Sequence, residues 1–270
     1  MKKVLIVFDG SHFSEGVFDF VIKQNASNPL LLTCVFLSSI DYSTMLGYPI
    51  VAEGYLRTIN DDVAAISKNA DRVRILCEKN GIEYRLHDDV GGDALMLLQK
   101  ETRFADLLII SGELFYRGMN DKQPVAYMQH ILHKAECPVL VLPEKYEYPT
   151  NIILGYDGSH ASVYAIKQFI YLFPEWCKCN AYLIYANEKD NDIPDKDYIT
   201  ELAARHFPNL ILHKLDMDAS KYFDTWITDI KSPILVTGAF ARSGISELMR
   251  KSFVSEVIRD HKVPVFVAHR

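Results

Sequence analysis

The feature that most constrains this chain is an internal duplication. Residues 4–14, Val-Leu-Ile-Val-Phe-Asp-Gly-Ser-His-Phe-Ser, recur 148 residues later as Ile-Ile-Leu-Gly-Tyr-Asp-Gly-Ser-His-Ala-Ser. Two further matches share an offset of 126 residues and join 105–112 to 231–238 and 137–142 to 263–268. Three matches in the same order indicate two copies of one domain, because chance similarity between apolar strands would not preserve the order.

The two offsets differ by 22 residues, so the first copy contains extra chain. Residues 38–55 are polar and aromatic and are interrupted by Gly47, Pro49 and Gly54, which predicts an insertion over about 38–59. A surface loop is the preferred interpretation of this insertion, with a lid or a partner surface as the alternative. The charged segment 144–150 is the predicted linker, so we expect domains over 1–145 and 150–270.

Apolar runs rich in Val, Ile and Leu alternate with amphipathic stretches in both copies, which predicts parallel strands joined by helices. The expected strands are 3–8, 30–37, 83–87, 106–111 and 138–142, then 151–155, 181–185, 210–215, 234–238 and 265–268. Helices are expected over 11–24, 60–80, 93–102 and 125–134 in the first copy. The predicted fold class is α/β, with two doubly wound, mostly parallel five-stranded sheets and helices on both faces.

Composition excludes several classes of protein. The net charge of −6 argues against general affinity for nucleic acid or for an acidic membrane surface. The longest apolar runs have the length of a strand, and the N-terminal run is too short for the core of a signal peptide. Five cysteines without the spacing of a disulfide framework predict reduced thiols. We therefore expect a cytoplasmic protein.

Both copies have an aspartate at the end of the first strand, Asp9 and Asp157. Ligands of doubly wound sheets bind beyond the carboxyl ends of the strands, where a carboxylate can accept hydrogen bonds from a ribose or a base. An Asp-Gly-Ser turn can also simply cap the following helix. The sequence leaves these two interpretations open, because a cap would survive duplication equally well.

The loop after the fourth strand of the second copy begins at Gly238 and is rich in cations, among them Arg242, Arg250 and Lys251. Lys251 and Ser252 are predicted to start the last helix, whose free N–H groups and dipole attract phosphate. A solvated basic loop with a serine cap is the alternative interpretation. A P-loop is excluded, because Arg250 occupies a position where that motif requires glycine.

The repeated Asp-Gly-Ser turn, the Gly238 loop and the closing Val-Pro-Val-Phe-Val strand resemble the universal stress protein family in its tandem form, over essentially all 270 residues. The resemblance implies a Rossmann-like, adenine nucleotide alpha hydrolase-like fold. In the nucleotide-binding branch, Gly-x2-Gly-x9-Gly-Ser/Thr holds the phosphates, and these four positions fall on Gly238, Ala241, Lys251 and Ser252. The sequence therefore departs from the motif at two of its three glycines.

The resemblance also implies which residues contact the adenosine part of ATP, bound with or without Mg²⁺. Asp157 takes that position, and other contacts of the binding branch with the nucleotide fall on Gly155, Ala186 and Thr237. In the first copy the phosphate motif falls on Gly112, Phe115, Val125 and Ala126, which offer neither a hydroxyl nor a cation. We therefore expect that half to be structural, or to bind something other than a triphosphate.

Other clusters give weaker signals. Cys177-Lys-Cys179 lacks zinc-motif spacing, and no third ligand accompanies His130 and His133, so no metal site is predicted. His12 and His160 follow the Asp-Gly-Ser turns and are candidates for a place beside the pocket.

The preferred hypothesis is a stress-response binding and regulatory module rather than an enzyme. The alternatives are a weak ATP hydrolase or nucleotidyl transferase, for which Glu247 is the nearby acid, and a ligand-free interaction module. Single-domain members of the family pair through their last strand. The resemblance therefore implies that 139–142 meets 265–268 antiparallel in an intramolecular pseudo-dimer, and a further homodimer is left open.

Overall fold

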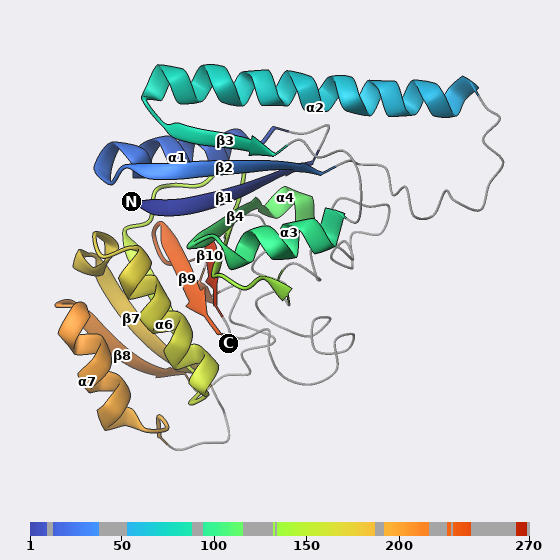
Figure 1. The fold of residues 1–270 in the computed structure, drawn as a ribbon. Coiled ribbons are helices and arrows are strands. Elements are labelled where there is room, and N and C mark those ends of the chain that lie inside the picture. The colour runs from blue at the N-terminus through green and yellow to red at the C-terminus, as the bar shows by residue number, and fades with distance from the viewer. Residues whose placement is uncertain are drawn as a thin grey trace. The chain divides into compact units, whose positions relative to one another are not determined.

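The structure is a computed structural model that describes residues 1–9, 13–37, 53–87, 94–115, 132, 134–186, 192–215, 226–227, 229–238 and 263–268. The chain forms two compact units, Met1–Ile110 and Ser111–Arg270, and each is described by itself (Figure 1). The helix expected over 125–134 falls mostly outside the described residues.

The first unit is built on parallel strands in the order β3-β2-β1-β4. Its elements are β1 (Lys2–Asp9), α1 (Glu15–Ser27), β2 (Leu30–Leu37), α2 (Glu53–Asn80), β3 (Glu83–His87), α3 (Ala94–Arg103) and β4 (Leu107–Ser111). Strand β1 lies between β2 and β4, and its side chains from Val4 to Phe8 are at most 3% exposed, so both of its faces are covered. Burial on both faces explains why this strand is a continuous apolar run rather than an alternating one.

Aromatic side chains join α1 to the sheet of the first unit. The Phe8 ring stacks on Phe13 and Phe36, with centroids 5.1 and 5.4 Å away. The Arg72 guanidinium of α2 lies 4.2 Å from the centroid of the Phe13 ring and forms an ion pair with Glu15 of α1. These contacts attach both helices to the end of β1.

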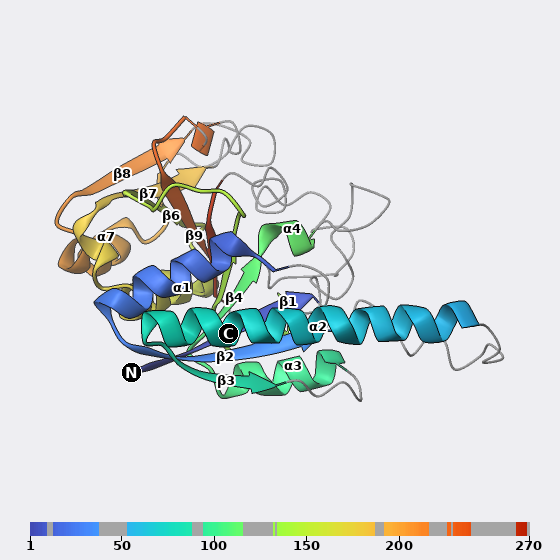
Figure 2. The ribbon, with the colours of Figure 1, turned by 90° about the horizontal axis from the view of Figure 1, so that it is seen from above.

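Helix α2 begins at Glu53, whereas the sequence predicted a start at about residue 60, so the last residues of the predicted insertion over about 38–59 are helical. Both views show its N-terminal part running beyond the strands of the first unit (Figures 1 and 2). The apolar spacing explains the early start, because Leu56, Ile59 and Val63 continue a helical period that leads to the buried Ile66. Residues 38–52 lie outside the described part of the chain.

The second unit has strands in the order β5-β10-β9-β6-β7-β8, parallel except that β5 is antiparallel to β10. Its elements are α4 (Gly112–Phe115), β5 (Val139–Leu142), β6 (Asn151–Gly155), α6 (His160–Leu172), a 3-10 turn (Trp176–Lys178), β7 (Asn180–Ala186), α7 (Lys196–His206), β8 (Leu210–Leu215), β9 (Pro233–Thr237) and β10 (Val265–Val267). Figure 1 shows α6 and α7 on the same face of this sheet. The fold class, a mostly parallel α/β sheet with helices, is confirmed.

Strand β5 comes from the first sequence copy but lies in the second unit. Leu140 faces Phe266, and Val141 faces Val265, in the antiparallel ladder with β10. The expected pairing of 139–142 with 265–268 is therefore present. The boundary between the two units, at Ile110, therefore differs from the predicted boundary between the two sequence copies, at 145–150. The reason for the difference is that this ladder joins the end of the first copy to the end of the second.

The segment 144–150, predicted as a linker, is attached to the second unit. The indole N–H of Trp176 donates to the hydroxyl of Tyr148 (3.2 Å), and their rings meet edge to face at 5.4 Å. The N–H of Thr150 donates to the carbonyl of Ser232 (3.0 Å). These bonds fix the chain as it enters β6.

No disulfide joins any of the five cysteines, as predicted. Burial, and to a smaller extent the nearby carboxylates of Glu78 and Glu175, raise the pKa of Cys77 to about 12 and that of Cys177 to about 11. High pKa values make these thiols poor nucleophiles. Among the described residues, no three Cys, His, Asp or Glu side chains gather as a metal site, and no helix is long and apolar enough to cross a membrane.

Candidate functional site

The candidate site lies where β6 ends, between β7 and β9. Gly155 pairs with Ile184 of β7, and a Cβ atom placed on Gly155 would lie 3.2 Å from the carbonyl oxygen of Val236 in β9. From β6 the chain crosses through α6 to β7, whereas β9 lies on the other side of β6. The strand order therefore reverses here, which is the position where doubly wound sheets bind ligands.

Asp157 forms a turn at this point. Its Oδ1 accepts a hydrogen bond from the Ser159 N–H (2.9 Å), and the side chain is exposed. The low-dielectric surroundings oppose ionisation, but hydrogen bonds from Ser159 and Ser162 outweigh this effect and lower the pKa of Asp157 below its ordinary value. The carboxylate is therefore ionised at neutral pH and can accept further hydrogen bonds from a ligand.

The two copies of the Asp-Gly-Ser turn start their helices differently. In the second copy Ser159 caps α6, because its Oγ accepts a hydrogen bond from the Ser162 N–H (3.2 Å). In the first copy the cap of α1 is Ser14, three residues further along the repeat, and it accepts from the Val17 N–H (3.3 Å). Asp9 is the last residue of β1, and its side chain lies outside the described part of the structure.

Gly238 lies directly against the first turn of α6. A Cβ atom on Gly238 would lie 2.2 Å from the carbonyl carbon of Ala161 and 2.5 Å from the nitrogen of Ser162. Backbone atoms fill this space, so a side chain here would push β9 and α6 apart. The glycine thus allows the end of β9 to pack beside the turn that contains Asp157.

Thr237 and Ala186 end the strands on either side of β6. Thr237 is 2% exposed, its Cβ lies 3.9 Å from the Cβ position of Gly155, and its carbonyl accepts a hydrogen bond from the Ala268 N–H (3.2 Å). Ala186 closes β7 opposite Leu215. Gly155, Asp157, Thr237 and Gly238 therefore come together, with Ala186 at the same edge of the sheet.

The residues expected to hold phosphate lie outside the described part of the chain. They are Ala241, Arg242, Lys251 and Ser252, together with Glu247. His12 also lies outside it, whereas His160 is exposed at the first position of α6. The adenosine half of the predicted site thus has a described geometry, and the phosphate half stays a prediction.

Tyr156 is a residue that sequence reasoning missed. It is 5% exposed, and its hydroxyl donates to the carbonyl oxygen of Pro194 (3.0 Å). Gly158, with a φ of +77°, lets the same turn approach Pro194, because a Cβ on it would lie 3.0 Å from the proline ring. This contact fixes the loop before α7 against the turn after β6. The sequence did contain a signal, because Tyr156 lies between Gly155 and Asp157. Successive side chains of a strand point to opposite faces of the sheet, so the side chain of Tyr156 points away from its two neighbours.

Glu113 is the second missed residue, and it follows the first-copy glycine Gly112. Its carboxylate accepts hydrogen bonds from the hydroxyl of Ser111 (2.7 Å) and the N–H of Glu144 (2.8 Å). The matching position in the second copy is Ala239. A carboxylate beside the motif glycine would repel phosphate, which agrees with the expectation that the first copy holds no triphosphate.

Comparison of this geometry with solved structures reveals its fold. The chain matches a universal stress protein from Archaeoglobus fulgidus DSM 4304 over 100% of its length and 96% of that chain, at 16% identity and a TM-score of 0.75. It matches a protein of Pseudomonas aeruginosa UCBPP-PA14, described as a universal stress protein, over 100% and 93%, at 14% identity and a TM-score of 0.56.

A third match is the cytoplasmic domain of a prokaryotic cation chloride cotransporter, over 98% of this chain and 94% of that one, at 11% identity and a TM-score of 0.53. No protein-family model matches the chain, and no curated protein matches its sequence. The structural matches establish that the chain has the fold of the universal stress proteins.

Proposed function

We propose that this chain is a tandem universal stress protein, a stress-response binding and regulatory module that binds an adenine nucleotide in its second half. The proposal rests on the shared fold, on the sequence duplication, and on the motif positions that survive in the second copy. It assigns the protein no catalytic turnover.

The observation that carries this proposal is the packing of Gly238 against the first turn of α6. It brings the end of β9 beside the ionised Asp157, at the point where the strand order reverses. A nucleoside bound here would donate hydroxyl or amino groups to the Asp157 carboxylate. Gly155 and Ala186, which have no bulky side chains, would leave room for it.

In the same proposal, Arg242, Lys251 and Ser252 hold the phosphates of ATP, and Ala241 takes the position of the second motif glycine. A helix start with a hydroxyl and nearby cations is the arrangement that phosphate binding uses. Mg²⁺ would enter with the nucleotide. The two halves would form an intramolecular pseudo-dimer, and the β5–β10 ladder supports this part of the proposal.

Titration calorimetry with ATP tests the assignment. Changing Lys251 and Ser252 together to alanine should weaken binding by about 1–3 kcal/mol, the scale of lost charge-assisted hydrogen bonds. Changing the first-copy residues Val125 and Ala126 to serine should leave the affinity unchanged, because Glu113 disfavours phosphate in that copy. Equal effects in both copies would show that the assignment of the site to the second half is wrong. If the wild type does not bind ATP, the nucleotide proposal is eliminated.

A ligand-free interaction module is the second candidate function. It is favoured by the departure of the second copy from the phosphate motif at Ala241 and Lys251, where the nucleotide-binding branch has glycine. Chromatography of the acid-denatured protein separates the two candidates, because a nucleotide-binding protein should release a co-purified nucleotide and an interaction module should release none.

A further inference from the structure

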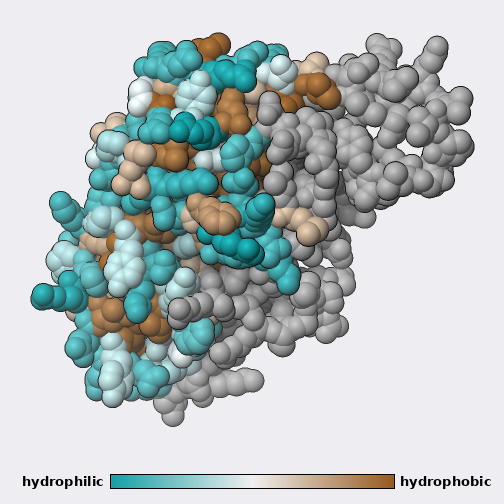
Figure 3. Space-filling view, viewed as in Figure 1, coloured by the Kyte–Doolittle hydropathy of each residue, from teal (hydrophilic) through white to brown (hydrophobic). Residues whose placement is uncertain are grey.

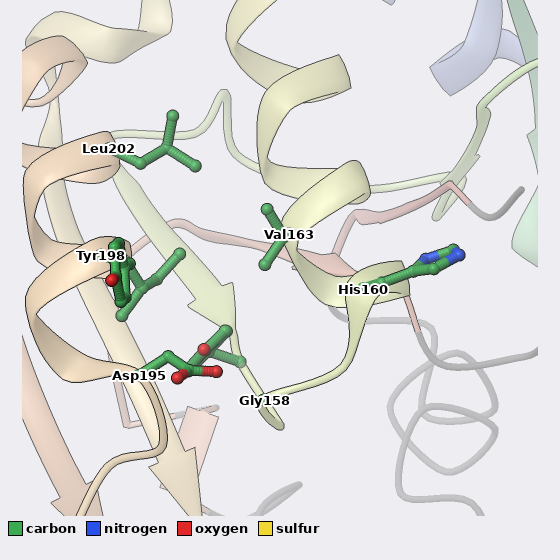
Figure 4. Close-up of a pocket in the computed structure, with 8 residues that line it drawn as sticks. Gly158, His160, Val163, Asp195, Tyr198 and Leu202 are labelled. Carbon is green, nitrogen blue, oxygen red and sulfur yellow. The ribbon is translucent and has the colours of Figure 1, made fainter.

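A pocket of about 370 Å³ lies between α6 and α7, and Asp157 is not among its lining residues. Val163 of α6 and Ile199 and Leu202 of α7 line its apolar part. In Figure 4, Val163 and Leu202 point toward each other across the pocket, Asp195 and Tyr198 lie on the α7 side, and His160 points away. The space-filling view shows hydrophobic side chains between α6 and α7 on this face (Figure 3).

Asp195 precedes α7 in an unusual backbone conformation, with φ 46° and ψ 38°. An aspartate before a helix normally accepts a hydrogen bond from the first turn, but the Asp195 side chain makes no such cap bond. Its carboxylate lies close to the buried Tyr156, whose pKa is raised by burial and then by Asp195 and Asp157. The carboxylate thus faces the pocket and serves no capping role in α7.

The loop that carries Asp195 is held in place from three sides. The Tyr156 hydroxyl donates to the Pro194 carbonyl (3.0 Å), and Pro194 packs against the turn at Gly158. The N–H of Ile199 donates to the Asp195 carbonyl (3.1 Å). The backbone that carries Asp195 is therefore fixed before any ligand arrives, which confines the entropy lost on binding mostly to the side chains.

The electrostatics of the pocket favour a cation. Among the described residues, its lining includes the Asp195 carboxylate and no lysine or arginine. The ammonium of the neighbouring Lys196 lies 3.9 Å from the carboxylate of Asp192. Tyr198 is 78% exposed and offers its ring to a ligand beside this carboxylate.

We infer that this pocket binds a small organic cation, an alkylammonium group on an apolar stem. The ammonium pairs with Asp195, and the stem lies against Tyr198, Val163 and Leu202. The pocket volume admits a single aromatic or branched aliphatic amine. The pocket borders the turn that carries Asp157 through Tyr156 and Gly158, but its apolar part lies between α6 and α7 and does not include Asp157.

The test uses the full chain and two probes of the same shape, phenethylamine and 2-phenylethanol, in an NMR titration. The amine should bind saturably with a dissociation constant of about 1 mM, as expected for a ligand of this size. The neutral alcohol should bind about threefold more weakly, the scale of an exposed ion pair. Asp195→Asn should remove this difference, since asparagine tolerates the same backbone conformation.

Tyr198→Ala should weaken the binding of both probes about threefold. Tyr171→Ala, at an exposed tyrosine of α6 outside the pocket, should leave the binding of both probes unchanged. Circular dichroism establishes that each variant is folded. Three results would overturn the inference: equal binding of amine and alcohol by the wild type, a preference for the amine that survives in Asp195→Asn, or no saturable amine binding up to about 10 mM.

Discussion

At the end of β6, the Asp157 carboxylate accepts the Ser159 N–H, and its pKa is lowered from the ordinary value of 3.8. Because the pKa of Asp157 is lower in the folded protein than in the unfolded chain, its ionised form stabilises the folded protein at pH values above the pKa of the unfolded state. This stabilisation is lost as the pH falls through the pKa of the folded state. Asp157→Ala should therefore destabilise the protein by about 0.5–1 kcal/mol at neutral pH, the scale of a lost hydrogen bond at an exposed side chain. The difference from wild type should shrink below pH 3.8.

Urea denaturation at several pH values measures this effect. Asp197→Ala is the matched control, because Asp197 lies in the first turn of α7 and is exposed. Its effect should stay within about 0.5 kcal/mol. A destabilisation by Asp157→Ala that grows on acidification would contradict the assigned direction of the pKa shift.

The second prediction at the scale of single residues concerns Gly238. A methyl group there would lie 2.2 Å from the Ala161 backbone, so Gly238→Ala should reduce the free energy of unfolding by about 1–3 kcal/mol. Gly155→Ala is the matched control, because its nearest contact would be 3.2 Å and its cost should be smaller. The order of the two denaturation midpoints checks the prediction, and the reverse order would refute the close packing of β9 on α6.

Among the connecting segments, residues 144–150 are anchored through Tyr148. Tyr148→Phe keeps the ring against Trp176 but removes the acceptor of the indole N–H, which should cost about 0.5–1.5 kcal/mol. The emission of Trp176 should change in the folded state. Tyr171→Phe, at an exposed tyrosine of α6, should leave both stability and emission as they are. Unchanged emission in Tyr148→Phe would mean that the two side chains do not meet in solution.

For the whole molecule, the β5–β10 ladder predicts that the two sequence copies recognise each other. Fragments 1–145 and 146–270, expressed together, should associate through the antiparallel pairing of Leu140 with Phe266, measured by size-exclusion chromatography with light scattering. Leu140→Pro should abolish the association, because proline cannot sit in a paired strand. Fragments that remain separate, or that associate despite the proline, would contradict the predicted pseudo-dimer.

The amino-acid sequence alone determined the duplication, the α/β class and the bounds of several strands. Leu30–Leu37, Glu83–His87, Asn151–Gly155 and Leu210–Leu215 begin and end where the sequence predicted. Residues buried by neighbouring strands must be apolar, and turns need Gly, Pro, Asn or Asp, so both signals are local and legible in one sequence. The position of Asp157 at a strand end was predictable for the same reason.

The tertiary structure decided features that depend on distant contacts. Gly238 was assigned to the first glycine of the phosphate motif, yet its Cβ direction meets Ala161, which is 77 residues away in the chain. The bond from Tyr156 to Pro194 and the attachment of β5 to β10 likewise join distant segments. Such contacts leave no periodic pattern, because each depends on how the strands are ordered in space and not on the residues beside it in the sequence.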